Sequence, residues 1–88
     1  MSSQIRRCAS SIAANIAEGF GREQNRPFIH FLRISQGSLK ELETHLLLVQ
    51  RVELASAATV EPLLSACENT GKMLRGLIRS LQKREIEA

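Results

Sequence analysis

The chain lacks the residues on which several kinds of function depend. Its 88 residues contain no Asp, Trp or Tyr, and they include only two Cys and two Pro. Two cysteines cannot build a disulfide-dense scaffold, and 43% hydrophobic residues with little Pro or Gly exclude collagen-like and disordered chains. No apolar run approaches the roughly 18–20 residues of a membrane span. The composition predicts a small globular domain in the cytoplasm, with both cysteines reduced and no membrane partner.

The chain also lacks the sets of residues that catalysis or metal binding would need. Without Asp, and without a Ser in a recognisable nucleophile elbow, a catalytic triad has no anchor. His30 and His45 are 15 residues apart on one predicted helix, so about 22 Å separates them and they cannot share a metal ion within one chain. We therefore expect no enzyme activity, no cofactor, no metal site and no small-molecule substrate.

Apolar residues recur at alternating steps of three and four, which predicts three amphipathic helices over residues 3–18, 26–52 and 60–84. Gly19 is expected to end the first helix as its C′ residue, and Thr59 to cap the third. Gly71, within the apolar stripe of the third helix, indicates a close helix crossing. The pattern predicts a single domain over residues 1–88, all-α, an up-down antiparallel bundle.

The end of the second predicted helix is apolar on almost every side. A helix that is apolar all round is buried all round, and a chain of this length has a marginal core unless partner subunits help. We therefore predict an oligomer interface formed by Leu46, Leu47, Leu48, Val52 and Leu54. The alternative is that the following turn folds back over this end.

Basic residues lie on one face of the second predicted helix, within about 40° of one another. They are Arg26, Arg33, Lys40 and Arg51, and the set could extend through Arg6, Arg7 and Arg22. Cations spaced along a rigid helix can follow a nucleic-acid backbone, so these seven form the candidate RNA or DNA surface. The alternative is an ordinary solvated face. On the third helix, acids first and bases last match the helix macrodipole instead.

Three blocks of sequence resemble one family when read together: residues 11–22 (SIAANIAEGFGR), 28–32 (FIHFL) and 37–44 (GSLKELET). They are similar to the bacterial four helix bundle proteins encoded in intervening sequences of 23S ribosomal RNA genes. The resemblance implies antiparallel four-helix subunits in a ring-like homopentamer. It also implies kinship with the accessory protein of diversity-generating retroelements, hence nucleic-acid binding. It brings no catalytic residues.

The chain departs from that pattern at its start. The resemblance implies a further leading amphipathic helix of some 25–30 residues, ahead of the segment that here begins at Met1. Three apolar stripes instead of four should leave an apolar groove. We expect a segment missing ahead of Met1, either because Met1 is an internal start or because the chain is shortened; the other interpretation is that neighbouring subunits fill the groove.

Polar residues within the matching blocks form a further candidate patch. They are Asn15, Glu18, Glu41, Glu43 and Thr44, with Ser11 beside them. One interpretation is capping and inter-helix hydrogen bonding near a bundle end. The other is a patch shared between subunits around Arg22, although an Arg–Glu pair there could simply hold the turn.

The sequence therefore predicts a non-enzymatic oligomeric bundle that binds RNA or DNA backbone through a basic surface. The alternative is a structural scaffold that binds protein and no nucleic acid.

Overall fold

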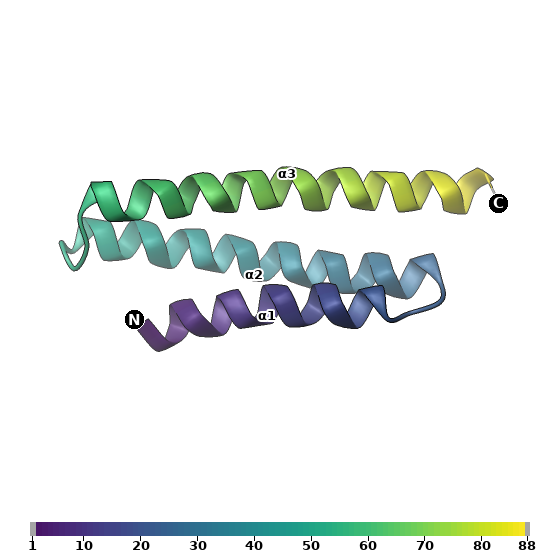
Figure 1. The fold of residues 1–88 in the computed structure, drawn as a ribbon, viewed down its shortest axis with the longest axis horizontal. Coiled ribbons are helices and arrows are strands. Elements are labelled where there is room, and N and C mark those ends of the chain that lie inside the picture. The colour runs from purple at the N-terminus through teal and green to yellow at the C-terminus, as the bar shows by residue number, and fades with distance from the viewer. Residues whose placement is uncertain (1, 88) are drawn as a thin grey trace.

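The computed structural model describes residues 2–87, and the regular structure of this part of the chain is entirely helical. Helix α1 spans Ser2–Phe20, α2 spans Asn25–Arg51 and α3 spans Ala57–Glu87. Consecutive helices run in opposite directions, and α2 lies between the other two (Figure 1). The prediction of an all-α chain with three helices is confirmed. None of these helices is both long and apolar enough to cross a membrane.

Gly19 does not end α1 as predicted. The helix continues to Phe20, and Gly19 is buried without a left-handed backbone. A Cβ at this position would lie 2.8 Å from Phe28 Cδ1 and 3.0 Å from Phe31 Cβ. Glycine therefore stands here because the end of α1 approaches the start of α2 too closely for a side chain.

Ser56, and not Thr59, caps α3. The Thr59 amide donates to Ser56 Oγ at 3.2 Å, and the amides of Thr59 and Val60 both reach the Ser56 carbonyl at 3.0 Å. Ser56 thus accepts the otherwise unpaired amides of the first turn. Ser56 lies three residues ahead of Thr59, and α3 begins directly after it, at Ala57.

The end of α2 adopts a Schellman motif on a residue that disfavours it. The Leu54 amide donates to the Val49 carbonyl and the Glu53 amide to the Gln50 carbonyl, at 3.0 and 3.1 Å. Glu53 has φ of 63°, in the left-handed region that usually takes glycine. The tight reversal into α3 therefore carries local backbone strain.

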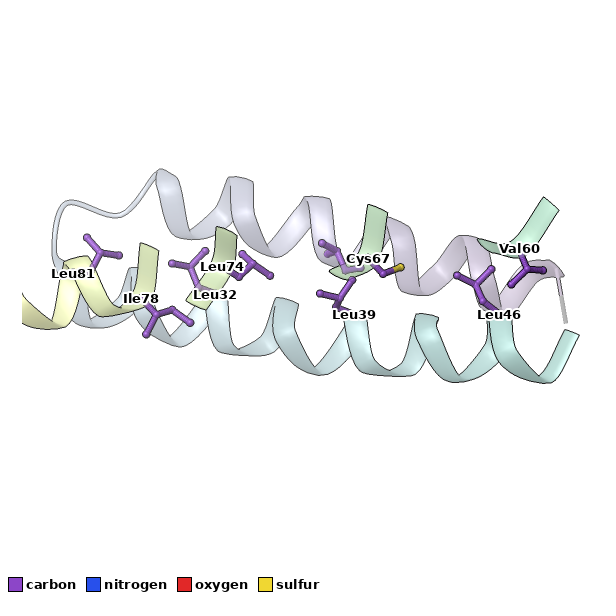
Figure 2. Packing of buried hydrophobic residues seen from close by; sticks show 9 residues of the cluster. Leu32, Leu39, Leu46, Val60, Cys67, Leu74, Ile78 and Leu81 are labelled. Carbon is purple, nitrogen blue, oxygen red and sulfur yellow. The ribbon is translucent and has the colours of Figure 1, made fainter. Parts of the chain in front are cut away.

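The core follows the contact between α2 and α3. Its buried side chains recur every seven residues, at Leu32, Leu39 and Leu46 on α2 and at Val60, Cys67, Leu74 and Leu81 on α3 (Figure 2). Seven-residue spacing keeps one seam of each helix facing the other, as in a coiled coil. Gly71 is buried beside this seam, and a Cβ there would lie 3.4 Å from Leu39 Cδ2, as its predicted place at a close crossing requires.

Helix α1 packs on α2 from another side. Ile12 is its contribution to the main core cluster, and the fully buried Ser35 hydroxyl lies 3.1 Å from the Ile12 carbonyl, which it can donate to across the helix contact. Within residues 2–87, no close backbone contact joins α1 to α3. An apolar groove consequently runs between α1 and α3 over α2, as the three-stripe pattern predicted.

Candidate nucleic-acid interface

The basic face of α2 is rigid and open to solvent. Arg26, Arg33, Lys40 and Arg51 are all exposed, and they sit on one 27-residue helix whose opposite side is held by the buried core. At about 1.5 Å per residue, this row extends over roughly 38 Å. A straight row of that length can follow several phosphates of a nucleic-acid strand without bending.

Two of the four cations are already paired. Arg26 Nε lies 3.0 Å from Glu85 Oε1, and Lys40 Nζ lies 3.6 Å from Glu43 Oε1. In each pair the cation is largely exposed to solvent. Each pair therefore contributes little to stability, and its cation can exchange the carboxylate for a phosphate. Among the described residues, Arg33 and Arg51 form no ion pair, so no carboxylate of the chain competes for either guanidinium.

Arg75 joins this face from α3, although the sequence pattern did not nominate it. Lys40 and Arg75 line the same hollow of about 200 Å³ between α2 and α3, together with Gln36 and the acids Glu43 and Glu68. Arg79 follows Arg75 by four residues and is exposed on nearly the same side of α3. The signal was present in that spacing, but only the packing of α3 on α2 shows that Arg75 lies beside Lys40.

Acids also lie on this α2–α3 side, beside the cations and towards the α2–α3 turn. Glu43, Glu61 and Glu68 line one hollow next to Leu47 and Leu64. Glu68 also pairs with Lys72 at 3.7 Å. Acids are thus interspersed with the cations from Lys40 towards the α2–α3 turn, while Arg33 and Arg51 are exposed on α2 outside both hollows.

The three arginines predicted to extend the basic face lie in two different surroundings. Arg6 and Arg7 are exposed on α1. Arg22 forms a 2.6 Å ion pair with Glu18, and its guanidinium lies 5.0 Å from the centre of the Phe31 ring. Arg22 therefore holds the α1–α2 turn, as the structural interpretation of this residue expected.

The predicted polar patch is divided among several places in the chain. At the α1–α2 seam, the hydroxyls of Ser11 and Ser38 lie 2.8 Å apart, Asn15 Nδ2 donates to the Ser11 carbonyl at 2.8 Å, and Cys8 Sγ donates to Glu41 at 3.8 Å. Glu18, Glu43 and Thr44 are engaged elsewhere, with Arg22, Lys40 and the Lys40 carbonyl respectively. Within one chain these residues stabilise helix contacts and turns and do not converge on one site.

Both cysteines are free and buried, as predicted. Burial raises the pKa of the Cys8 thiol, with a further contribution from the Glu41 carboxylate, and burial likewise raises the pKa of Cys67. A raised pKa keeps a thiol protonated and unreactive. Across residues 2–87, no three His, Cys or Glu side chains are grouped so as to hold a metal ion.

The apolar end of α2 remains uncovered in the single chain. Leu47, Leu48, Val52 and Leu54 are 56%, 42%, 52% and 69% exposed, so the turn does not fold back over them. Leu46 differs from the prediction, because it is buried in the chain's own core. Four of the five predicted interface residues are thus available to a partner.

Comparison of the chain with protein families gives a match over most of its length. The model of the family described as 23S rRNA-intervening sequence protein matches residues 1–76, which span α1, α2 and about two thirds of α3. Comparison of the chain with curated proteins and with solved structures gives no match.

Proposed function

Because this chain belongs to the 23S rRNA-intervening sequence protein family, we propose that it is a self-associating, non-enzymatic bundle protein of the cytoplasm that binds the phosphate backbone of RNA. The observation that carries the proposal is the exposed basic surface of Arg33, Lys40 and Arg51 on α2 and Arg75 on α3. Without Trp or Tyr to stack on bases, such a surface holds the backbone and does not read the sequence.

Binding should weaken steeply as salt rises, because each phosphate contact releases counterions. We would measure the affinity for a generic single-stranded RNA across a salt series. The double variant Arg33→Glu with Lys40→Glu should lower affinity at least about tenfold and flatten the logarithmic salt slope by about 1 to 2 units. If the surface recognises the phosphate backbone alone, duplex DNA measured alongside should bind as well.

Arg84→Glu is the matched control for Arg33→Glu. It changes the net charge by the same amount at another exposed arginine, and its place on α3 is about 180° from Arg75. It should leave RNA affinity within about twofold of the unaltered chain. Absence of RNA binding at low salt would overturn the proposal. An equal loss of RNA affinity in the single variants Arg33→Glu and Arg84→Glu would also overturn it.

A second candidate function is a structural scaffold that binds protein only, and the exposed apolar end of α2 favours it. Leu47→Glu should lower the mass seen by light scattering if this end joins copies of the chain, because a buried unpaired charge is costly. An unchanged mass would mean that this end does not mediate self-association.

A further inference from the structure

The seven-residue repeat of the α2–α3 core continues through the turn without a change of phase. Leu46 ends this repeat on α2 and Val60 begins it on α3, and Glu53 lies seven residues from each of them. The facing residues of the core are pairs at equal sequence distances from Glu53: Leu46 with Val60, Leu39 with Cys67, and Leu32 with Leu74 (Figure 2). Glu53 is therefore the central position of one repeat that α2 and α3 share.

The turn itself contains no residue that breaks a helix. Residues 52–56 include neither Gly nor Pro, and Glu53, Leu54 and Ala55 are good helix formers. A continuous helix would meet no new obstacle at Pro62, because α3 already accommodates this proline. The reversal of the chain is therefore imposed by the packing of α3 on α2 and not by the local sequence.

The closed turn is strained where a continuous helix would not be. Glu53 has φ of 63°, and a left-handed backbone costs a residue with a side chain about a five- to thirtyfold factor in an equilibrium. Short turns under strain favour exchange of an element between copies. A helix that ran straight through residues 52–56 would remove this cost and keep the repeat in phase.

Opening the turn would expose the buried leucines of α2, and these need the same partner residues in the same register. Only α3 of another copy offers them. We propose that the α2–α3 turn is a hinge, at which the hairpin opens into one continuous helix so that two copies exchange their α3 helices. This inference goes beyond the proposed function, because it uses the core seam and neither the basic face nor Leu47.

The exchanged pair would rebuild every contact of α3 and add new ones only at its centre. There Glu53 would face its counterpart in the second copy, and Val52, which is 52% exposed in the closed chain, would flank that contact. Helix α1 stays on α2 of its own chain, so the exchange does not depend on what covers the groove between α1 and α3. Two facing carboxylates repel each other, so exchange should require a high chain concentration.

A distance within one chain separates the two forms. Lys40 and Glu68 are exposed and line one hollow between α2 and α3, so spin labels on Lys40→Cys and Glu68→Cys should lie about 10–20 Å apart in the closed hairpin. In one continuous helix the same labels would lie about 42 Å apart. Labelling the folded chain spares the buried native thiols, and an excess of unlabelled chains restricts the measurement to labels on one chain. We expect the long distance after refolding at about 1 mM and its loss after refolding at about 1 µM.

Substitutions at the hinge should shift this population in opposite directions. Glu53→Leu should raise the exchange equilibrium constant at least about tenfold, because two leucines would meet at the centre of the seam. Glu53→Gly should lower it at least about tenfold, because glycine relieves the closed turn and weakens the continuous helix.

Ala57→Pro should block the exchange. Position 57 is the first residue of α3, where proline is tolerated, but in the continuous helix it would be an interior position. We expect the exchange equilibrium constant to fall at least about 100-fold, with helical circular dichroism retained. Ala57→Ser, which keeps the backbone amide, is the matched control and should stay within about threefold of the unaltered chain.

Three results would overturn the hinge. They are a short distance alone in the unaltered chain refolded at about 1 mM, an unchanged long-distance population in Ala57→Pro, and equal populations in Glu53→Gly and Glu53→Leu. Failure of the proposed function is distinguishable from these. If RNA binding is absent while the Glu53 and Ala57 variants shift the label distance as expected, the proposed function is wrong and the hinge stands.

Discussion

Alanine at Gly37 should stabilise the protein, and the same substitution at Gly19 should destabilise it. Gly37 lies in the interior of α2 without a left-handed backbone, and a Cβ there would have no atom within 4 Å. Glycine in a helix interior is about 1 kcal/mol less favourable than alanine. Gly37→Ala should therefore raise the free energy of unfolding by about 1 kcal/mol and Tm by about 4–8 °C for a chain of this size.

At Gly19 the same gain in helix propensity is opposed by a clash. The added Cβ would lie 2.8 Å from Phe28 Cδ1 and 3.3 Å from the Phe28 carbonyl oxygen. Phe28 must shift, and overpacking of this kind costs about 1–3 kcal/mol. After the propensity gain of about 1 kcal/mol is subtracted, Gly19→Ala should lose roughly 1 kcal/mol.

Thermal and urea unfolding followed by circular dichroism would measure both changes. Chain concentration must be fixed, because the self-association proposed above would make Tm depend on it. Gly76, also in a helix interior with no atom within 4 Å of an added Cβ, is the replicate of Gly37. If Gly19→Ala stabilises the protein as much as Gly37→Ala, then α1 does not approach α2 at Gly19 too closely for a side chain. If Gly37→Ala destabilises the protein while the mass in solution stays the same, position 37 is not a helix position with free space around an added Cβ.

Two further predictions concern the α2–α3 turn and the buried thiols. Glu53→Gly should raise the free energy of unfolding by about 0.5–1 kcal/mol, because glycine adopts the left-handed conformation of Glu53 without steric cost; Glu53→Ala, compared by urea unfolding, should not. The pKa values of Cys8 and Cys67 are raised in the folded state, so the folded chain holds these protons more tightly than the unfolded chain. Stability should be independent of these groups below the ordinary thiol pKa of about 8.5 and should fall as pH rises above it. Urea midpoints from pH 7.5 to 10 would show this, and a Cys8→Ala, Cys67→Ala variant with an equally steep decline would contradict it.

Periodicity was enough to predict most of the fold. The three helices begin and end within about three residues of their predicted bounds, because apolar residues at steps of three and four identify helix interiors wherever they are sustained. The ends were less well predicted. Gly19 and Thr59 each have a residue type suited to the predicted role, but the packing of Phe28 and the earlier serine at position 56 decided the outcome.

The candidate site was only partly predictable. The exposure of Arg33 and Arg51 follows from their place opposite the apolar stripe of α2. The pairing of Arg26 with Glu85 spans 59 residues, and the shared hollow of Lys40 and Arg75 joins two helices. Neither could be read from spacing along one helix.

By itself, the sequence determined the helices, the stripe that each buries, the buried free cysteines and the family. Each of these depends on local spacing or composition, which a chain carries whatever its neighbours do. Only the tertiary structure decided that α1 and α3 both pack on α2 but not on each other, that Arg75 lies beside Lys40, and that Leu46 is buried while Leu47 is exposed. The physical reason is that a helix apolar on every side can turn any of those sides inward, and packing against specific partners selects one.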